Sequence, residues 1–131
     1  MAIRVVQLGS DRRPGEGLRL GTVRRPPRGV PKSQYASRNF YDVWVPELSP
    51  SPATIKSFQS GEQSDARWRH FARRYRSEMK APERARLLDL LAAMSRTADF
   101  AVGCYCEDER RCHRSILRKL LRERGADIAD P

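Results

Sequence analysis

The run DFAVGCYCEDERRCHRS, residues 99–115, decides the fold. Its first part, residues 99–104, is short and apolar, which is typical of a buried strand. Its last part opens a stretch with helical spacing of apolar residues at Ile116, Leu117, Leu120 and Leu121. Gly125 ends that pattern. A buried strand that leads directly into a helix is the repeating unit of an α/β domain.

The rest of the chain extends this pattern towards both ends. Two more strands are predicted. Apolar residues cluster in residues 3–8, and apolar and aromatic residues alternate in residues 40–45. Helices are expected from Ser51, an N-cap followed by proline, to about residue 58, and over residues 65–79 and 83–94. We expect the Trp68, Phe71 and Tyr75 stripe of the second helix to pack in the core.

The order of these elements is strand, loop, strand, three helices, strand, helix. Two strands separated by helices imply a crossover, so the sheet is expected to be mainly parallel. The prediction is an α/β fold with one small domain, residues 1–131, and helices flanking the sheet. A basic loop, residues 11–39, lies within it, and residues 126–131 form a short tail that starts one more strand.

Composition bounds the class of protein. The chain has 131 residues, of which 39% are hydrophobic and 32% charged, enough to build one packed core. No apolar run approaches 18 residues and no signal peptide is visible, so we expect a cytoplasmic protein without a membrane span. The three cysteines lie within nine residues, an unsuitable arrangement for a disulfide framework, and predict reduced thiols.

The formal net charge is +10, and residues 1–40 carry nine basic and two acidic residues. Such a surplus attracts polyanions, so a phosphate-bearing small molecule is a plausible partner, and nucleic acid another, without sequence specificity. The chain has 22 arginines and four lysines, which is the pattern of a GC-rich coding bias and a sufficient cause of the charge by itself. The oligomeric state is left open.

The junction from Cys104 to Arg114 is the candidate site. Parallel sheets place their ligands beyond the carboxyl ends of the strands, and this segment follows one such end. Free N–H groups and the helix dipole at the start of the following helix favour an anion and a thiolate at Cys112. Arg114 is expected to clamp the anion, and Cys106 to face the same space.

This junction resembles the domain of unknown function 488 family. The resemblance rests on Cys106 and Glu107 followed, after four residues, by Cys112-His113-Arg114 and then Leu117. Three other stretches are similar to that family: residues 28–30, residues 41–51, and the spacing of Trp68, Phe71, Tyr75 and Glu78. The resemblance spans about residues 22–125. It implies a small α/β domain of undetermined function, with Asp42, Glu47 and the loop around Arg28 near the cysteine junction.

Three kinds of function remain open at this point. The first is a ligand site or enzyme, in which an anionic or nucleotide-like ligand is bound by Arg114, Arg28, Asp42 and Glu47. Cys106 or Cys112 is then the nucleophile, with His113 or Glu107 as acid–base partner. Because adjacent helical residues point about 100° apart, we expect His113 to serve Cys106 rather than Cys112.

The second kind is a metal site. We expect no bound metal and no other cofactor. The spacing lacks a Cys-x2-Cys pair, Cys104 is expected to point into the sheet, and His70 lies among arginines. In an extended strand Cys104 and Cys106 would stand about 7 Å apart. The third kind is a non-enzymatic binding module that uses the basic loop and the arginine face of residues 65–79 for a polyanion.

Overall fold

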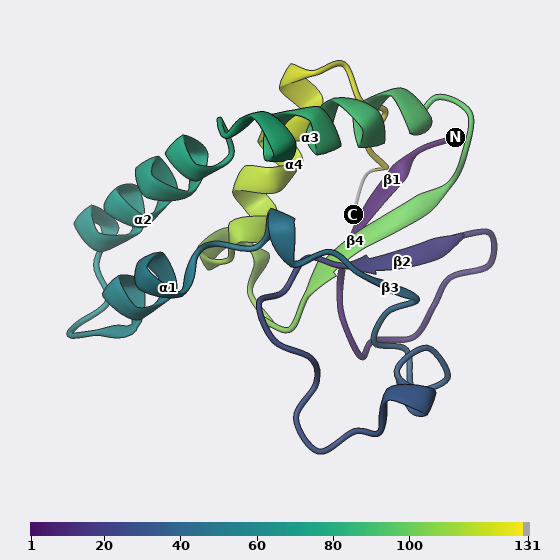
Figure 1. The fold of residues 1–131 in the computed structure, drawn as a ribbon, viewed down its shortest axis with the longest axis horizontal. Coiled ribbons are helices and arrows are strands. Elements are labelled where there is room, and N and C mark those ends of the chain that lie inside the picture. The colour runs from purple at the N-terminus through teal and green to yellow at the C-terminus, as the bar shows by residue number, and fades with distance from the viewer. Residues whose placement is uncertain (130–131) are drawn as a thin grey trace.

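Four parallel strands form the centre of the molecule in the order β1-β4-β2-β3 (Figure 1). A computed structural model describes residues 1–129 of the chain. The strands are β1 (Ile3–Gln7), β2 (Leu18–Gly21), β3 (Val43–Trp44) and β4 (Phe100–Cys104). The predicted parallel α/β architecture is confirmed, with β4 as the central strand between β1 and β2.

Four α-helices accompany the sheet: α1 (Pro52–Gln59), α2 (Asp65–Glu78), α3 (Pro82–Met94) and α4 (His113–Glu123). Within the described residues, three short 3-10 turns lie between β2 and β3 (Lys32–Gln34), between β3 and α1 (Pro46–Leu48), and between β4 and α4 (Glu109–Arg111). Ser51 caps α1 as predicted, because its side chain accepts a hydrogen bond from the backbone N–H of Thr54. Within the described residues no helix is both long and apolar enough to cross a membrane.

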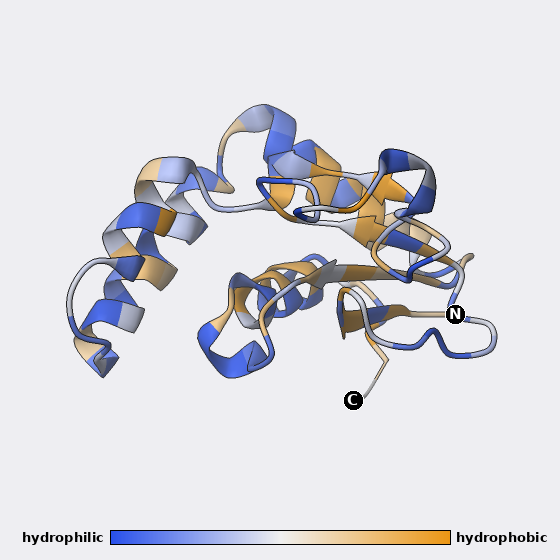
Figure 2. Cartoon of the chain, turned by 90° about the horizontal axis from the view of Figure 1, so that it is seen from below, coloured by the Kyte–Doolittle hydropathy of each residue, from blue (hydrophilic) through white to orange (hydrophobic). Residues whose placement is uncertain are grey.

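The main core lies between the sheet and α2, α3 and α4. It is built from apolar side chains of β1, β4 and these three helices, among them Ile3, Val102, Tyr75, Leu88 and Leu117. Figure 2 shows the hydrophobic residues concentrated in the strands, whereas the part of the chain with α1 and α2 is mainly hydrophilic. Phe71 and Tyr75 are buried, as predicted for the aromatic stripe, and Trp68 is partly buried.

Strand β2 corrects the prediction that residues 11–39 are one loop. It is only four residues long, and it is preceded by Gly17, whose positive φ of +82° suits glycine. A Cβ there would lie 1.9 Å from the backbone oxygen of Asp99. The chain therefore enters β2 at a point of close backbone approach to β4. This pairing depends on tertiary contacts that a local pattern does not show.

Arg19 in β2 is a buried polar anchor. Its side chain has no exposed surface, and it forms an ion pair with Glu16, which is 2% exposed, at 2.8 Å. The guanidinium also donates to the backbone oxygens of Ser10 at 2.8 Å and Asn39 at 2.6 Å. One side chain thus holds the segments before and after β2 together, which fixes where the carboxyl end of β2 lies.

Two other expectations are wrong in part. The strand predicted over residues 40–45 is reduced to Val43–Trp44, because Phe40 and Tyr41 pack in a second apolar cluster. Trp44, in this short strand, is 44% exposed, and its indole N–H donates to the backbone oxygen of Val23 at 2.7 Å. The tail contributes a single bridge between Ile128 and Ile3, and residues 130–131 lie outside the described residues.

Candidate functional site

A cluster of three thiols lies just beyond the carboxyl end of β4. The sulfur atoms of Cys104, Cys106 and Cys112 all lie within 4.8 Å of one another, and those of Cys104 and Cys106 are 3.8 Å apart. Cys104 and Cys112 are buried, and Cys106 is exposed. The expectation of an extended segment with Cys104 and Cys106 about 7 Å apart is wrong. Strand β4 ends at Cys104 and the chain bends at Tyr105, so the two sulfur atoms approach each other.

His113 is held in one orientation by the end of β2. Its Nε2 lies 2.7 Å from the backbone oxygen of Thr22 and 3.2 Å from the Thr22 hydroxyl. A carbonyl oxygen only accepts, so Nε2 carries a proton and donates it to Thr22. Nδ1 lies 3.8 Å from the sulfur of Cys112. The structure therefore places His113 beside its neighbour Cys112, contrary to the expectation from ideal helix geometry.

The thiols share hydrogen bonds, and this sets their relative acidity. Hydrogen bonds from Cys104 and Cys106 lower the pKa of the Cys112 thiol, burial opposes them, and His113 lowers it further. The pKa of Cys104 is raised, first by its hydrogen bond with Cys106 and then by that with Cys112. The hydrogen bonds among the three thiols therefore favour the ionised form of Cys112 and disfavour that of Cys104.

Arg114 is buried and is not part of the lining of the cleft described below. The residue is 3% exposed, and its Nη2 donates to the backbone oxygen of Cys106. Its Nε atom is buried and has no hydrogen-bond partner within residues 1–129. The prediction of an exposed anion clamp is thus replaced by a buried guanidinium that positions the Cys106 backbone.

A cleft of about 720 Å³ opens from the thiol cluster to the surface. All three cysteines and His113 line it, together with the loop after β2 and α1. Its cationic side chains are Arg24, Arg25, Arg28, Lys56 and Arg111. No carboxylate of the described residues is part of this lining. Cys106, Cys112, His113 and Arg28, four of the residues singled out in the sequence, therefore share one cleft.

Three other predicted site residues do not line the cleft. Asp42 accepts hydrogen bonds from the Arg12 guanidinium at 2.8 Å and from the backbone N–H of Arg19 at 2.7 Å. These bonds outweigh the effect of its partial burial and lower the pKa of Asp42. Glu47 and Glu107 are exposed, and neither is part of the cleft lining.

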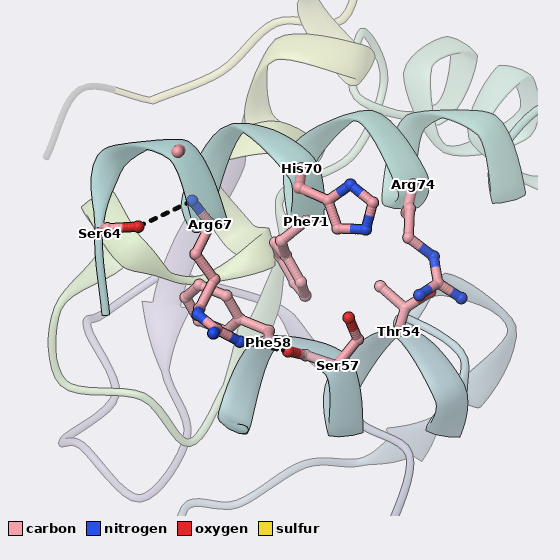
Figure 3. A pocket seen from close by; sticks show the side chains of 9 residues that line it. Thr54, Ser57, Phe58, Ser64, Arg67, His70, Phe71 and Arg74 are labelled. Carbon is pink, nitrogen blue, oxygen red and sulfur yellow. Dashed lines mark hydrogen bonds between the residues drawn. The ribbon is translucent and has the colours of Figure 1, made fainter. Parts of the chain in front are cut away.

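A second, smaller hollow of about 370 Å³ lies between α1 and α2 (Figure 3). His70 and Arg74 line it from α2, and Thr54 and Ser57 from α1. The hollow contains none of the thiols, so His70 and the cysteine cluster belong to different sites. It shares only Phe58 and Phe71 with the larger cleft.

Sequence reasoning missed three cleft residues, Arg24, Arg25 and Lys56, and also Thr22, which holds the cleft residue His113. Arg24 donates to the backbone oxygen of Pro50 at 3.2 Å and so ties the loop after β2 to the start of α1. Thr22 directly follows β2, and the local sequence pattern does not predict this strand, so it does not predict a role for Thr22 either. Had β2 been assigned, the rule that sites follow the carboxyl ends of parallel strands would have pointed to residues 22–25.

Fold and site together define a small parallel α/β domain with a cationic, thiol-lined cleft at the carboxyl end of its sheet. The family model described as "Active DUF488-N3 subclade" matches residues 3–125. The chain therefore belongs to this DUF488 family, as its sequence motifs predicted. Comparisons with curated proteins and with solved structures found no match.

Proposed function

We propose that the cleft binds a phosphate-bearing, nucleotide-like anion and that the thiol cluster forms the reactive end of this site. The observation that carries the proposal is the charge of the lining: five cationic side chains and no carboxylate from the described residues. Charge of one sign in a concave surface concentrates ligands of the opposite sign.

Three of these cations are free to bind a ligand. Arg25, Arg28 and Lys56 are exposed and form no ion pair within residues 1–129. Arg111, in contrast, is paired with Asp65. Unpaired guanidinium groups suit phosphate, because their planar N–H donors match its oxygens in pairs.

The apolar part of the cleft lining favours a nucleotide-like ligand over a simple inorganic anion. Ile55, Phe58 and Phe71 lie on the α1–α2 side, and Tyr105 on the side of the thiols. Aromatic side chains of this kind provide surface on which a planar base packs. A molecule with an anionic group and a flat ring would use both parts of the lining.

The proposal extends to chemistry at sulfur. Cys106 is the exposed thiol of the three, so in the metal-free protein it is the nucleophile that a bound ligand meets. Cys112 and His113 are in contact within the same cleft, and Glu107 is not part of the cleft lining. Free, clustered thiols agree with a reducing, cytoplasmic location.

Calorimetric titration tests the binding proposal. Pyrophosphate, AMP, ADP and adenosine are titrated into the wild-type chain, Arg28→Ala, Arg25→Ala and the control Arg86→Ala, which alters an exposed arginine of α3. We expect each phosphate compound to bind, and each cleft variant to weaken binding about tenfold, the effect of losing one charge-assisted contact. Equal affinities for Arg28→Ala, Arg25→Ala and wild type would refute the assignment.

A second titration, with an oligonucleotide, separates the alternative of a polyanion-binding surface on α2. In that helix Arg67 donates to the backbone oxygen of Ser57, and Arg76 pairs with Glu123, so two of its arginines already have partners. A surface function there predicts salt-dependent binding of an oligonucleotide that Arg73→Ala weakens and Arg28→Ala leaves unchanged.

A further inference from the structure

The spacing of the three sulfur atoms matches that of a metal-bound thiolate cluster. In a tetrahedral site with metal–sulfur bonds of about 2.3 Å, two sulfur ligands stand roughly 3.8 Å apart. The sulfurs of Cys104 and Cys106 are 3.8 Å apart, and all three fall within 4.8 Å of one another. Small side-chain rotations of Cys112 would complete one triangular face of a tetrahedron.

An independent observation comes from Arg114, a buried cation without an anionic partner. Its guanidinium is next to Cys106, its Nε is unsatisfied, and it forms no ion pair with any carboxylate of residues 1–129. A buried charge of this kind requires a compensating charge. Three thiolates around a divalent cation carry a net charge of −1, which balances the guanidinium.

We propose that Cys104, Cys106 and Cys112 together bind one thiophilic divalent cation of the class of Zn²⁺, leaving a fourth coordination position open to the cleft. Three protein ligands with an open position are the pattern of reactive rather than structural zinc sites. Each thiol that becomes a ligand releases its proton to solvent, and the oxidation state of the cation does not change.

The surrounding residues fit this role. His113 contacts the Cys112 sulfur through Nδ1, and its other nitrogen is fixed by Thr22, so it orients a ligand in the manner of an outer-shell residue. All three cysteines line the cleft, so the open position faces the bound anion, an inference that rests on the proposed function. The ion then becomes the reactive centre, and Cys106 is a ligand instead of a free nucleophile.

Metal titration of the reduced, metal-free full chain tests the inference. Zn²⁺ is titrated in competition with a chromogenic chelator, and Co²⁺ is added separately to read the ligands spectroscopically. We expect one equivalent of Zn²⁺ to bind, and the Co²⁺ form to show thiolate-to-metal charge transfer and tetrahedral d–d absorption. No binding at one equivalent, or a Co²⁺ spectrum without sulfur charge transfer, would overturn the site.

Two variants sharpen the test. Cys106→Ser changes an exposed residue, so it is expected to keep the wild-type circular dichroism. It should weaken Zn²⁺ binding by more than the roughly tenfold to hundredfold that outer-shell changes cost. Glu107→Gln, the neighbouring carboxylate, should bind like wild type. Unchanged affinity in Cys106→Ser, or a loss in Glu107→Gln, contradicts the three-thiolate set. If Zn²⁺ fails to bind while pyrophosphate still does, only the metal inference falls.

Discussion

Replacing Glu16 with glutamine leaves the buried guanidinium of Arg19 without its counter-charge. In the wild type the carboxylate receives hydrogen bonds from Arg19 Nε at 2.8 Å and Nη2 at 3.3 Å, and neither side chain is more than 2% exposed. Removing one partner of a buried pair costs roughly 3–5 kcal/mol, because the remaining charge stays desolvated. This is a large share of the roughly 5–15 kcal/mol that stabilises a domain.

Urea unfolding followed by circular dichroism measures the effect. With a slope of about 2 kcal/mol per molar urea, the loss corresponds to a midpoint lower by about 2 M. The control is Glu123→Gln, which breaks the exposed pair with Arg76 and should cost less than about 1 kcal/mol. If Glu16→Gln is as stable as the control, Arg19 does not anchor β2 in the way described here.

Two further predictions concern the core and the acid stability. Leu91 is 4% exposed, so Leu91→Ala should lower the free energy of unfolding in urea by about 2–5 kcal/mol. Leu90 is 54% exposed, so Leu90→Ala should change it little. Similar losses in both variants would contradict the orientation of this helix. Hydrogen bonds from Ser51 and Thr54 outweigh partial burial and lower the pKa of Glu78, so its stabilising effect is present above the unfolded value of about 4.3 and is lost as the pH falls through the folded pKa. The stability difference between wild type and Glu78→Gln should therefore shrink as the pH is lowered from 6 towards 3, a trend that unfolding at a series of pH values would show; a constant or growing difference would refute it.

The long amphipathic and apolar segments were predictable from the sequence. Helices α1 to α4 and strands β1 and β4 have strong local patterns, and their order required a crossover and a parallel sheet. Strand β2 was not predictable, because its four residues include Arg19, whose burial depends on Glu16. Local polarity suggested a loop, whereas Arg19 is buried by bonds to Glu16 and to the backbone oxygens of Ser10 and Asn39.

The elements around the thiol cluster were predictable, but the geometry of the cluster was not. The sequence placed the strand end at Cys104 and the helix start at His113, where the structure has them. The convergence of the thiols depends on the turn after Cys104, which periodicity arguments treat as a continuing strand. Likewise, the sequence does not reveal that Arg114 turns inward to the Cys106 carbonyl.

The central claim is that the cationic lining and the thiol cluster form one site. The most direct test is whether a bound anion protects Cys106 from alkylation. The chelator-treated chain is alkylated with neutral iodoacetamide at increasing pyrophosphate, and mass spectrometry follows each cysteine separately. We predict that pyrophosphate slows the alkylation of Cys106 to a plateau, and that Arg28→Ala needs about tenfold more pyrophosphate for the same effect. An alkylation rate that stays constant at every pyrophosphate concentration would show that the anion and the thiols do not share the cleft.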